Sequence, residues 1–149
     1  MSDDKLLRLL RDDLESIRLA AASLERSLVK CVNLTPAPRQ SFEDEETFDA
    51  LTSRFARTAD ILTQKILKTM VLLLREDAPT FIDRMNLCAK LGAIPSADEM
   101  IAVRDLRNMI AHEYATESLI ELYTDTVRLC PALLSAVASA ADFAARRFS

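Results

Sequence analysis

Apolar residues recur every three or four positions through the first part of this chain. The recurring positions are Leu7, Leu10, Leu14, Ile17, Ala21, Leu24, Leu28 and Cys31. A mean spacing of about 3.5 residues is that of a helix packed almost parallel or antiparallel to a neighbour. The spacing therefore predicts a helix over Asp4–Cys31, and its apolar stripe needs a second helix of similar length to cover it.

A second apolar stripe, which follows a break at Val32–Ser41, supplies that partner. Pro36 and Pro38 disfavour helix within the break. The stripe consists of Phe48, Leu51, Phe55, Ala59, Leu62, Ile66, Met70 and Leu73. It predicts a helix over Asp44–Arg75, roughly 45 Å long, that forms an antiparallel hairpin with the first helix. The acidic run Glu43–Glu46 fits the first turn of that helix better than it fits a metal site, because carboxylates are favourable at a helix N-terminus.

Signals for three further helices follow. A capping arrangement at Thr80 begins a short helix, and Gly92, the only glycine, is placed to end it. Ser96–Glu99 has the S-x-x-E form of a capping box, and a last helix is predicted over Thr116–Arg146. Strand-rich folds need aromatic and β-branched runs between Gly-rich turns, and the chain has only 5% aromatic residues. We therefore predict one all-α domain over residues 1–149, a five-helix up-and-down bundle with a long N-terminal hairpin.

Charge and cysteine content limit the classes of function. The net charge is −4 and the pI is about 5.1, which is not the broad basic footprint of a protein that coats nucleic acid. Cys31, Cys88 and Cys130 lie on apolar faces without a C-x-x-C motif, which indicates buried thiols in a reducing compartment. A single histidine argues against a Cys/His zinc site. With no signal-peptide layout and no apolar run of ~20 residues, we expect a soluble cytoplasmic protein without a cofactor, a bound metal or a membrane partner.

Basic side chains share one face of the predicted second helix. They are Arg54, Arg57, Lys65 and Lys68. Charged side chains on a helix face are usually just solvated, and a contribution to RNA contact is the alternative. The sequence leaves both interpretations open.

Candidate catalytic groups gather in one segment, Arg104–Tyr114, which contains the only histidine, His112. An imidazole exchanges protons at neutral pH, and the planar guanidinium of Arg107 suits a phosphate. Asp105 and Asn108 share a helical stripe with His112, because the three positions are separated by three and four residues. Asp105 and Asn108 are therefore candidates for positioning a substrate.

Helical geometry separates the two strongest candidates, Arg107 and His112. Five residues apart, they lie about 140° apart around a helix axis, so they do not face each other squarely. Two copies of the segment across a dimer axis would place both sets in one cleft. Structural alternatives stay open: His112 as a surface residue, Arg107 paired with an acid on a neighbouring helix, Asn108 as a bridge between helices, and Tyr114 in the core. Arg104 is predicted to form a structural ion pair.

Arg107, Asn108, His112 and Tyr114 follow one another as R-N-x-x-x-H-x-Y. This pattern resembles the R-x4-H-x-Y motif of the HEPN superfamily, especially the HepT toxins, in which asparagine commonly follows the arginine. The resemblance implies a HEPN-like bundle with the motif at the end of the penultimate helix, and a homodimer with a composite cleft. It also implies a metal-independent endoribonuclease in which the ribose 2′-hydroxyl attacks the adjacent phosphodiester. Arg107 and His112 would be catalytic, and Asn108 would orient the phosphate or His112.

The same resemblance implies partners. The substrate would be RNA, and the cognate antitoxin would be a small MNT-type nucleotidyltransferase in a type VII-like toxin–antitoxin system. That antitoxin would attach AMP to Tyr114 and block the cleft with a negative phosphate. Two other interpretations remain: a non-catalytic substrate-binding subunit of a small nucleotidyltransferase, and a helical dimerisation module in which the motif is structural.

Overall fold

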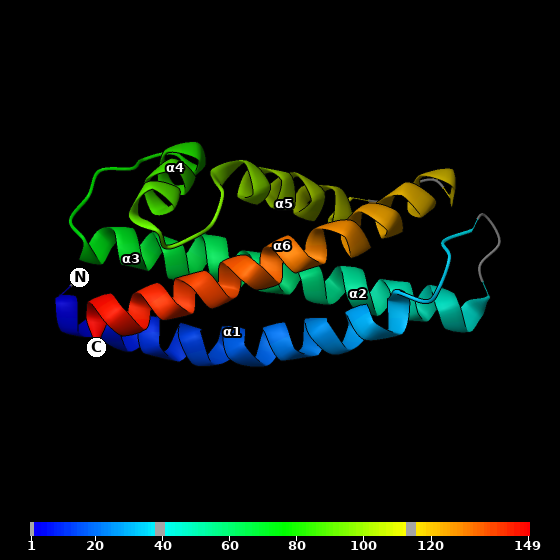
Figure 1. Cartoon of the computed structure of the whole chain (residues 1–149), viewed down its shortest axis with the longest axis horizontal. Helices are drawn as coiled ribbons and strands as arrows, with labels where there is room; N and C mark the ends of the chain where they lie inside the picture. The colour runs from blue at the N-terminus through cyan, green and yellow to red at the C-terminus, as the bar shows by residue number, and fades with distance from the viewer. Residues whose placement is uncertain (1, 38–40, 113–115) are drawn as a thin grey trace.

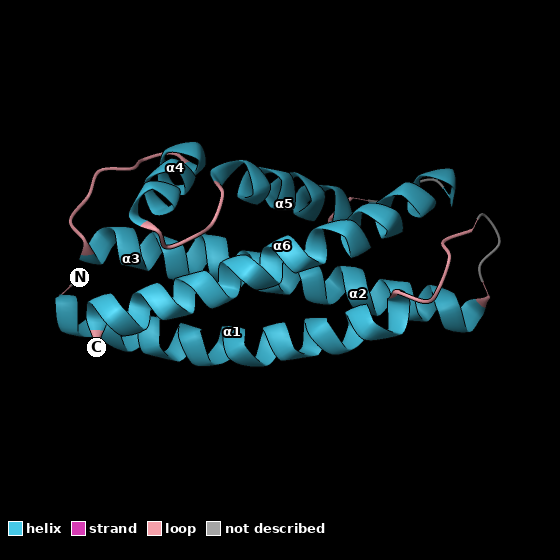
Figure 2. Cartoon of the chain, viewed as in Figure 1, coloured by secondary structure: helices cyan, strands magenta, loops and turns pink. Residues whose placement is uncertain are grey.

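Every regular element of the computed structural model is helical (Figure 2). The structure describes residues 2–37, 41–112 and 116–149, and this part of the chain contains no strand. The elements are α1 (Asp3–Cys31), α2 (Phe42–Asp60), the π-helical segment η1 (Ile61–Ile66), α3 (Leu67–Leu73), α4 (Phe81–Leu91), α5 (Ala97–Ile110) and α6 (Thr116–Phe148). Because α2, η1 and α3 are contiguous, they form one long helix, and the predicted all-α arrangement of five helices is confirmed.

All helices except α4 run up and down one axis (Figure 1). α1 and the long helix α2–η1–α3 form the predicted N-terminal hairpin, α5 and α6 run back and forth beside it, and the two termini lie at the same end. α4 is short and is seen nearly end-on in Figure 1. The end of α5 and the start of α6 therefore meet at the end of the bundle that is far from the termini.

Local capping signals set the starts of α2, α4 and α5 and the end of α4. The side chains of Ser41 and Ser96 accept hydrogen bonds from backbone amides in the first turns of α2 and α5. Thr80 and Asp83 form a reciprocal capping box at the start of α4. Gly92 ends that helix with φ +83°, a left-handed conformation that glycine adopts without steric cost.

The core is built around the long helix α2–η1–α3. Its apolar stripe, predicted from the sequence, is fully buried at Phe48, Leu51, Phe55, Leu62 and Ile66. This helix packs against α1, α5 and α6, and α4 covers its α3 end. Each side chain buried in this way contributes about 1.5–3 kcal/mol to folding. The long helix is therefore the element against which the others are placed.

The stripe of α1 lies one residue away from the predicted position at several points. The predicted Leu7 and Leu14 are half-buried, whereas Leu6 and Asp13 lie deeper; the same shift recurs further along the helix. The reason is that α1 packs against both the long helix and α6, so its covered face is wider than the seam between two helices. As a result, Asp13 is buried with only 9% of its surface exposed.

The three cysteines are free and buried, as predicted. Burial raises the pKa of the Cys88 thiol to about 11 and that of Cys130 to about 12. At neutral pH these two side chains are therefore protonated, and they pack as small apolar groups.

One helix in the described part of the chain, Leu119–Phe148, is long and apolar enough to cross a membrane by length and composition. Core helices of soluble proteins pass the same test. This helix packs against α1, α2 and α5 within the bundle.

Replacing Asp13 with asparagine is expected to stabilise the fold at neutral pH. Burial raises the pKa of the Asp13 carboxyl, and Lys65 only partly offsets this. The folded state thus binds this proton more tightly than the unfolded state, whose aspartate pKa is about 3.9. The protonated Asp13 carboxyl therefore contributes to the free energy of unfolding below its unfolded-state pKa. This contribution is lost as the pH rises through its pKa in the folded state.

Thermal unfolding from pH 3 to pH 8 measures this effect. Asp13→Asn should raise the melting temperature at pH 7, and the gain should shrink below about pH 4. Glu25→Gln, which removes an exposed carboxylate from the same helix, is the control. An equal gain in both variants at every pH would contradict the role of burial.

Candidate active site

A pocket of about 340 Å³ lies between the long helix and α5. It is lined by Ala59, Asp60, Thr63, Gln64, Lys65, Arg104, Arg107 and Asn108. Three of these side chains are cationic and one is anionic, so the lining suits an anion better than a cation. The described residues also contain no group of three or more His, Cys, Asp or Glu side chains that could hold a metal ion.

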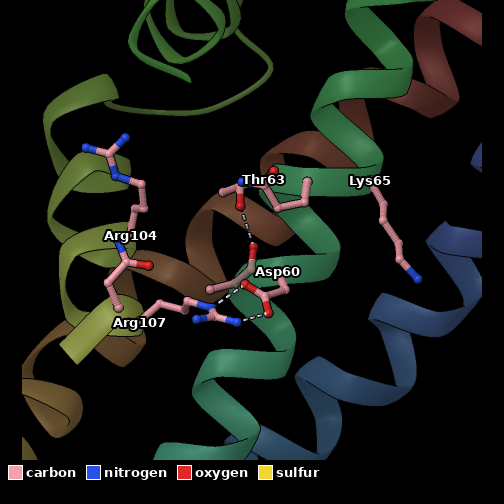
Figure 3. Close-up of a pocket in the computed structure, with 8 residues that line it drawn as sticks. Asp60, Thr63, Lys65, Arg104 and Arg107 are labelled. Carbon is pink, nitrogen blue, oxygen red and sulfur yellow. Dashed lines mark hydrogen bonds and ion pairs between the residues drawn. The ribbon is translucent and has the colours of Figure 1, made fainter. Parts of the chain in front are cut away.

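Arg107 reaches from α5 across the pocket to Asp60 on α2 (Figure 3). Its Nε and Nη2 donate to the two carboxylate oxygens at 2.7 and 2.9 Å, which is the bidentate geometry of a strong ion pair. These hydrogen bonds to Asp60 raise the pKa of Arg107 further above its ordinary value. The alternative in which Arg107 pairs with an acid on a neighbouring helix therefore describes this chain, and Arg107 is held in place by that pair.

Asp60 is a site residue that the sequence pattern did not lead us to expect. It sits at the last position of α2, directly before the π-helical segment. A signal was available, because Asp60 is the only acidic residue between Asp49 and Glu76, in a stretch that is otherwise basic, polar or apolar. A single carboxylate in such a stretch is a candidate ion-pair partner for an arginine of the motif.

The long helix widens where it borders the pocket. The amide of Leu67 bonds to the carbonyl of Leu62, five residues back, as in a π-helix. Thr63 donates its hydroxyl to the carbonyl of Ala59 at 2.8 Å within this region. Single π turns inside α-helices are frequent at functional sites. Gln64 and Lys65, which lie on this widened turn, line the pocket. No pattern in the sequence predicts the widened turn.

His112 lies beyond the end of α5, not within the helix as predicted. The helix ends at Ile110, and the amide of His112 bonds to the carbonyl of Met109, only three residues back. The angle of about 140° between Arg107 and His112, and the stripe shared with Asp105 and Asn108, assumed an intact helix; both predictions are corrected here. The His112 side chain is exposed and does not line the pocket.

The remaining motif residues separate into two groups. Arg107 and Asn108 line the pocket together, whereas Asp105 is exposed and lies 3.5 Å from Arg104 in a loose ion pair. The Arg104 guanidinium also stacks over the ring of Phe81, 4.3 Å from its centroid, and Figure 3 shows it pointing away from Arg107. Tyr114 lies outside the described residues. Within one chain, the structure therefore unites Arg107 with Asn108 but not with His112 or Asp105.

The Arg107–Asp60 pair should contribute to stability beyond the separate side chains. Both side chains are partly exposed, 33% and 42%, so solvent screening limits the pair to about 0.5–1 kcal/mol. Urea unfolding of Asp60→Ala, Arg107→Ala and the double variant gives this coupling energy. Glu15 and Arg18, an exposed pair within α1, form the control cycle, in which we expect no measurable coupling. A value for the Arg107–Asp60 cycle equal to that of the control would show that the pair does not tie the helices together.

No protein-family model matches the chain, and comparison with curated proteins and with solved structures gives no significant match. The HEPN resemblance therefore depends on the four motif residues, of which Arg107 and Asn108 lie in the last turn of the penultimate helix and His112 lies just beyond its end. What the site does is accordingly inferred from its own residues.

Proposed function

We propose that this chain is a metal-independent endoribonuclease, the toxin of a HEPN/MNT pair, and that it acts in the cytoplasm. The observation that carries the proposal is the pocket between the long helix and α5. Arg107 and Asn108 of the R-N-x-x-x-H-x-Y motif line it together with Lys65. A phosphate entering such a pocket would meet a fixed guanidinium and an amide, with the positive charge of Lys65 nearby. These groups can hold a phosphodiester and stabilise the charge that develops on it during cleavage.

The chemistry requires no group beyond these side chains and the RNA. The ribose 2′-hydroxyl loses a proton as its oxygen attacks the adjacent phosphorus, the bond to the 5′-oxygen breaks, and the leaving 5′-oxygen takes up a proton. The products are a 2′,3′-cyclic phosphate and a 5′-hydroxyl. His112 would move the proton, Arg107 would stabilise the charge on the phosphate, and Asn108 would orient it. DNA lacks the 2′-hydroxyl and would not be cut.

Two copies of the chain would complete the cleft. Within one chain, Arg107 is fixed to Asp60 and faces the pocket, whereas His112 is exposed beyond the end of α5. A two-fold axis beside the ends of the two α5 helices would bring Arg107 of one copy to His112 of the partner subunit. This arrangement supports a homodimer, because it turns an exposed histidine into part of an active site.

Neutralisation would use the tyrosine of the motif. Tyr114 follows His112 by two residues, and AMP on its hydroxyl would put a negative phosphate in the path of RNA. The partner would be an MNT-type nucleotidyltransferase antitoxin. Mass spectrometry after co-expression with that enzyme is expected to find AMP on Tyr114, with Tyr114→Phe as the control.

A second candidate is a non-catalytic partner subunit of a small nucleotidyltransferase. The observation that favours it is the bidentate bond between Arg107 and Asp60, since an arginine engaged in this way also serves as a tie between helices. In that case the motif would hold the bundle together and bind no scissile phosphate. The two candidates differ in whether the purified protein cleaves RNA.

RNA cleavage in EDTA separates these functions. Wild-type protein should cleave single-stranded RNA, and His112→Ala should lower the rate by roughly 10²–10⁴-fold, the usual contribution of a general acid or base. Arg107→Ala should lower it by roughly 10²–10³-fold, as for loss of a group that stabilises the transition state. Arg128→Gln, on the exposed face of α6, should cleave like wild type. Equal rates in all four proteins would remove the catalytic assignment.

A further inference from the structure

Positive charge is concentrated on the long helix α2–η1–α3. Residues 50–75 contain five basic residues and one acidic residue, in a chain whose net charge is −4. The acidic residue is Asp60, and its carboxylate is already bonded to Arg107. Four of the basic residues follow the outward side of the helix: Arg54, Arg57, Lys65 and Lys68. We call these four residues the basic ridge.

The π turn affects how the ridge is aligned. Two turns of an α-helix take about 7.2 residues, and a π turn takes roughly one more. Residues eight apart across η1, such as Arg57 and Lys65, therefore lie along the same line, and both are exposed. Figure 3 shows Lys65 pointing away from Arg107, toward α1. Arg54, Arg57 and Lys65 thus lie on the α1 side of the helix, whereas Lys68 lines a hollow beside the segment that leads to α4.

A second hollow, of about 260 Å³, lies on that side. It is lined by Ser16, Leu19, Ala20, Ser23, Arg54 and Arg57. Arg54 donates through Nη1 to Ser27 Oγ at 2.6 Å and to the carbonyl of Ser23 at 3.3 Å, so its guanidinium is held in place. An arginine fixed by neutral partners keeps its charge uncompensated. This leaves it available to a phosphate, and less side-chain entropy is lost on binding.

Several carboxylates lie near the ridge. Asp13 interacts electrostatically with Lys65 from a buried position on α1, and Glu76 and Asp77 line the same hollow as Lys68. Asp60 is satisfied by Arg107 on the opposite side of the helix. No ion pair involving Arg57, Lys65 or Lys68 is found among the described residues. A row of basic side chains without ion pairs, beside a phosphate-compatible pocket, is a surface that suits a polyanion.

We propose that the basic ridge binds the phosphate backbone of single-stranded RNA and leads it into the pocket at Arg107. The ridge spans roughly 20 Å between Arg54 and Lys68, enough for several phosphates of an extended strand. Lys65 belongs to the ridge and also lines the pocket. A ligand that uses both is RNA rather than an acidic protein surface or an anionic membrane, since neither of these would use the pocket. This inference rests on the proposed function, and it assigns substrate contacts that lie outside the R-N-x-x-x-H-x-Y motif.

The test is binding of a fluorescent 2′-O-methyl oligonucleotide of about 12 residues, a length within the site sizes of single-strand binding proteins. This probe cannot be cleaved, because its 2′-oxygen is blocked. The Arg57→Gln/Lys65→Gln double variant should bind it at least about tenfold more weakly than wild type. The slope of log affinity against log salt should fall by about 1.4, or roughly 0.7 for each phosphate that the variant no longer neutralises.

The matched control removes two exposed charges elsewhere, in Lys90→Gln/Arg128→Gln, on α4 and α6. Wild-type affinity in the control supports the ridge. An equal loss of affinity in both double variants, no binding of the probe by wild type, or binding to anionic vesicles in its place would each overturn the proposal. Circular dichroism melting of both variants confirms that they are folded.

Cleavage of unmodified RNA, measured in parallel, separates this proposal from the proposed function. If wild type binds the probe through the ridge but cleaves no RNA, the binding proposal is supported and the proposed nuclease function is contradicted. If wild type cleaves RNA and the ridge variant binds the probe like wild type, the nuclease function is supported and the binding proposal is contradicted.

Discussion

Burial of the apolar stripe of one long helix is the constraint on which this structure depends. Phe48, Leu51, Phe55, Leu62 and Ile66 are fully buried on it, and every other helix packs against some part of α2–η1–α3. No disulfide is formed by the three free cysteines, so packing of this helix holds the bundle together. Because it lies at the centre, any residue on its outward side is positioned rigidly relative to α1 and α5.

That rigidity is what gives the candidate active site its geometry. Asp60 lies at the end of α2, directly before the π turn, and it fixes Arg107 through two short hydrogen bonds. An arginine held by a carboxylate keeps its position when the substrate is absent, which lowers the entropy lost when a phosphate binds. The same carboxylate also competes with that phosphate for the guanidinium. The ion pair therefore keeps Arg107 ordered but makes it less available to a phosphate. Lys65, on the widened turn, also lines the pocket, with its side chain directed away from Arg107 and toward α1 (Figure 3).

The fold was predictable from the sequence to the extent that local signals determine it. The apolar stripe of Phe48–Leu73, the cap at Thr80 and the left-handed Gly92 all act through near neighbours in the chain, and the structure confirms them. The shift of the α1 stripe to Asp13 was not predictable, because it depends on a second neighbour, α6. The site follows the same division. Arg107 and Asn108 were identified from their place in the R-N-x-x-x-H-x-Y motif, whereas Asp60 lies 47 residues away from Arg107 along the chain and becomes its partner only when α2 packs against α5.

The exposed position of His112 makes the two-chain cleft the central claim, and complementation between inactive copies tests it most directly. Arg107→Ala and His112→Ala chains carrying different tags are co-expressed, and the mixed dimer is purified through both tags. If Arg107 of one copy acts with His112 of the partner subunit, the mixed dimer keeps one intact cleft. It should then cleave RNA at about half the wild-type rate per dimer, although each parent dimer is inactive. A mixed dimer as inactive as its parents, or a chain that stays monomeric at micromolar concentration, would contradict the account.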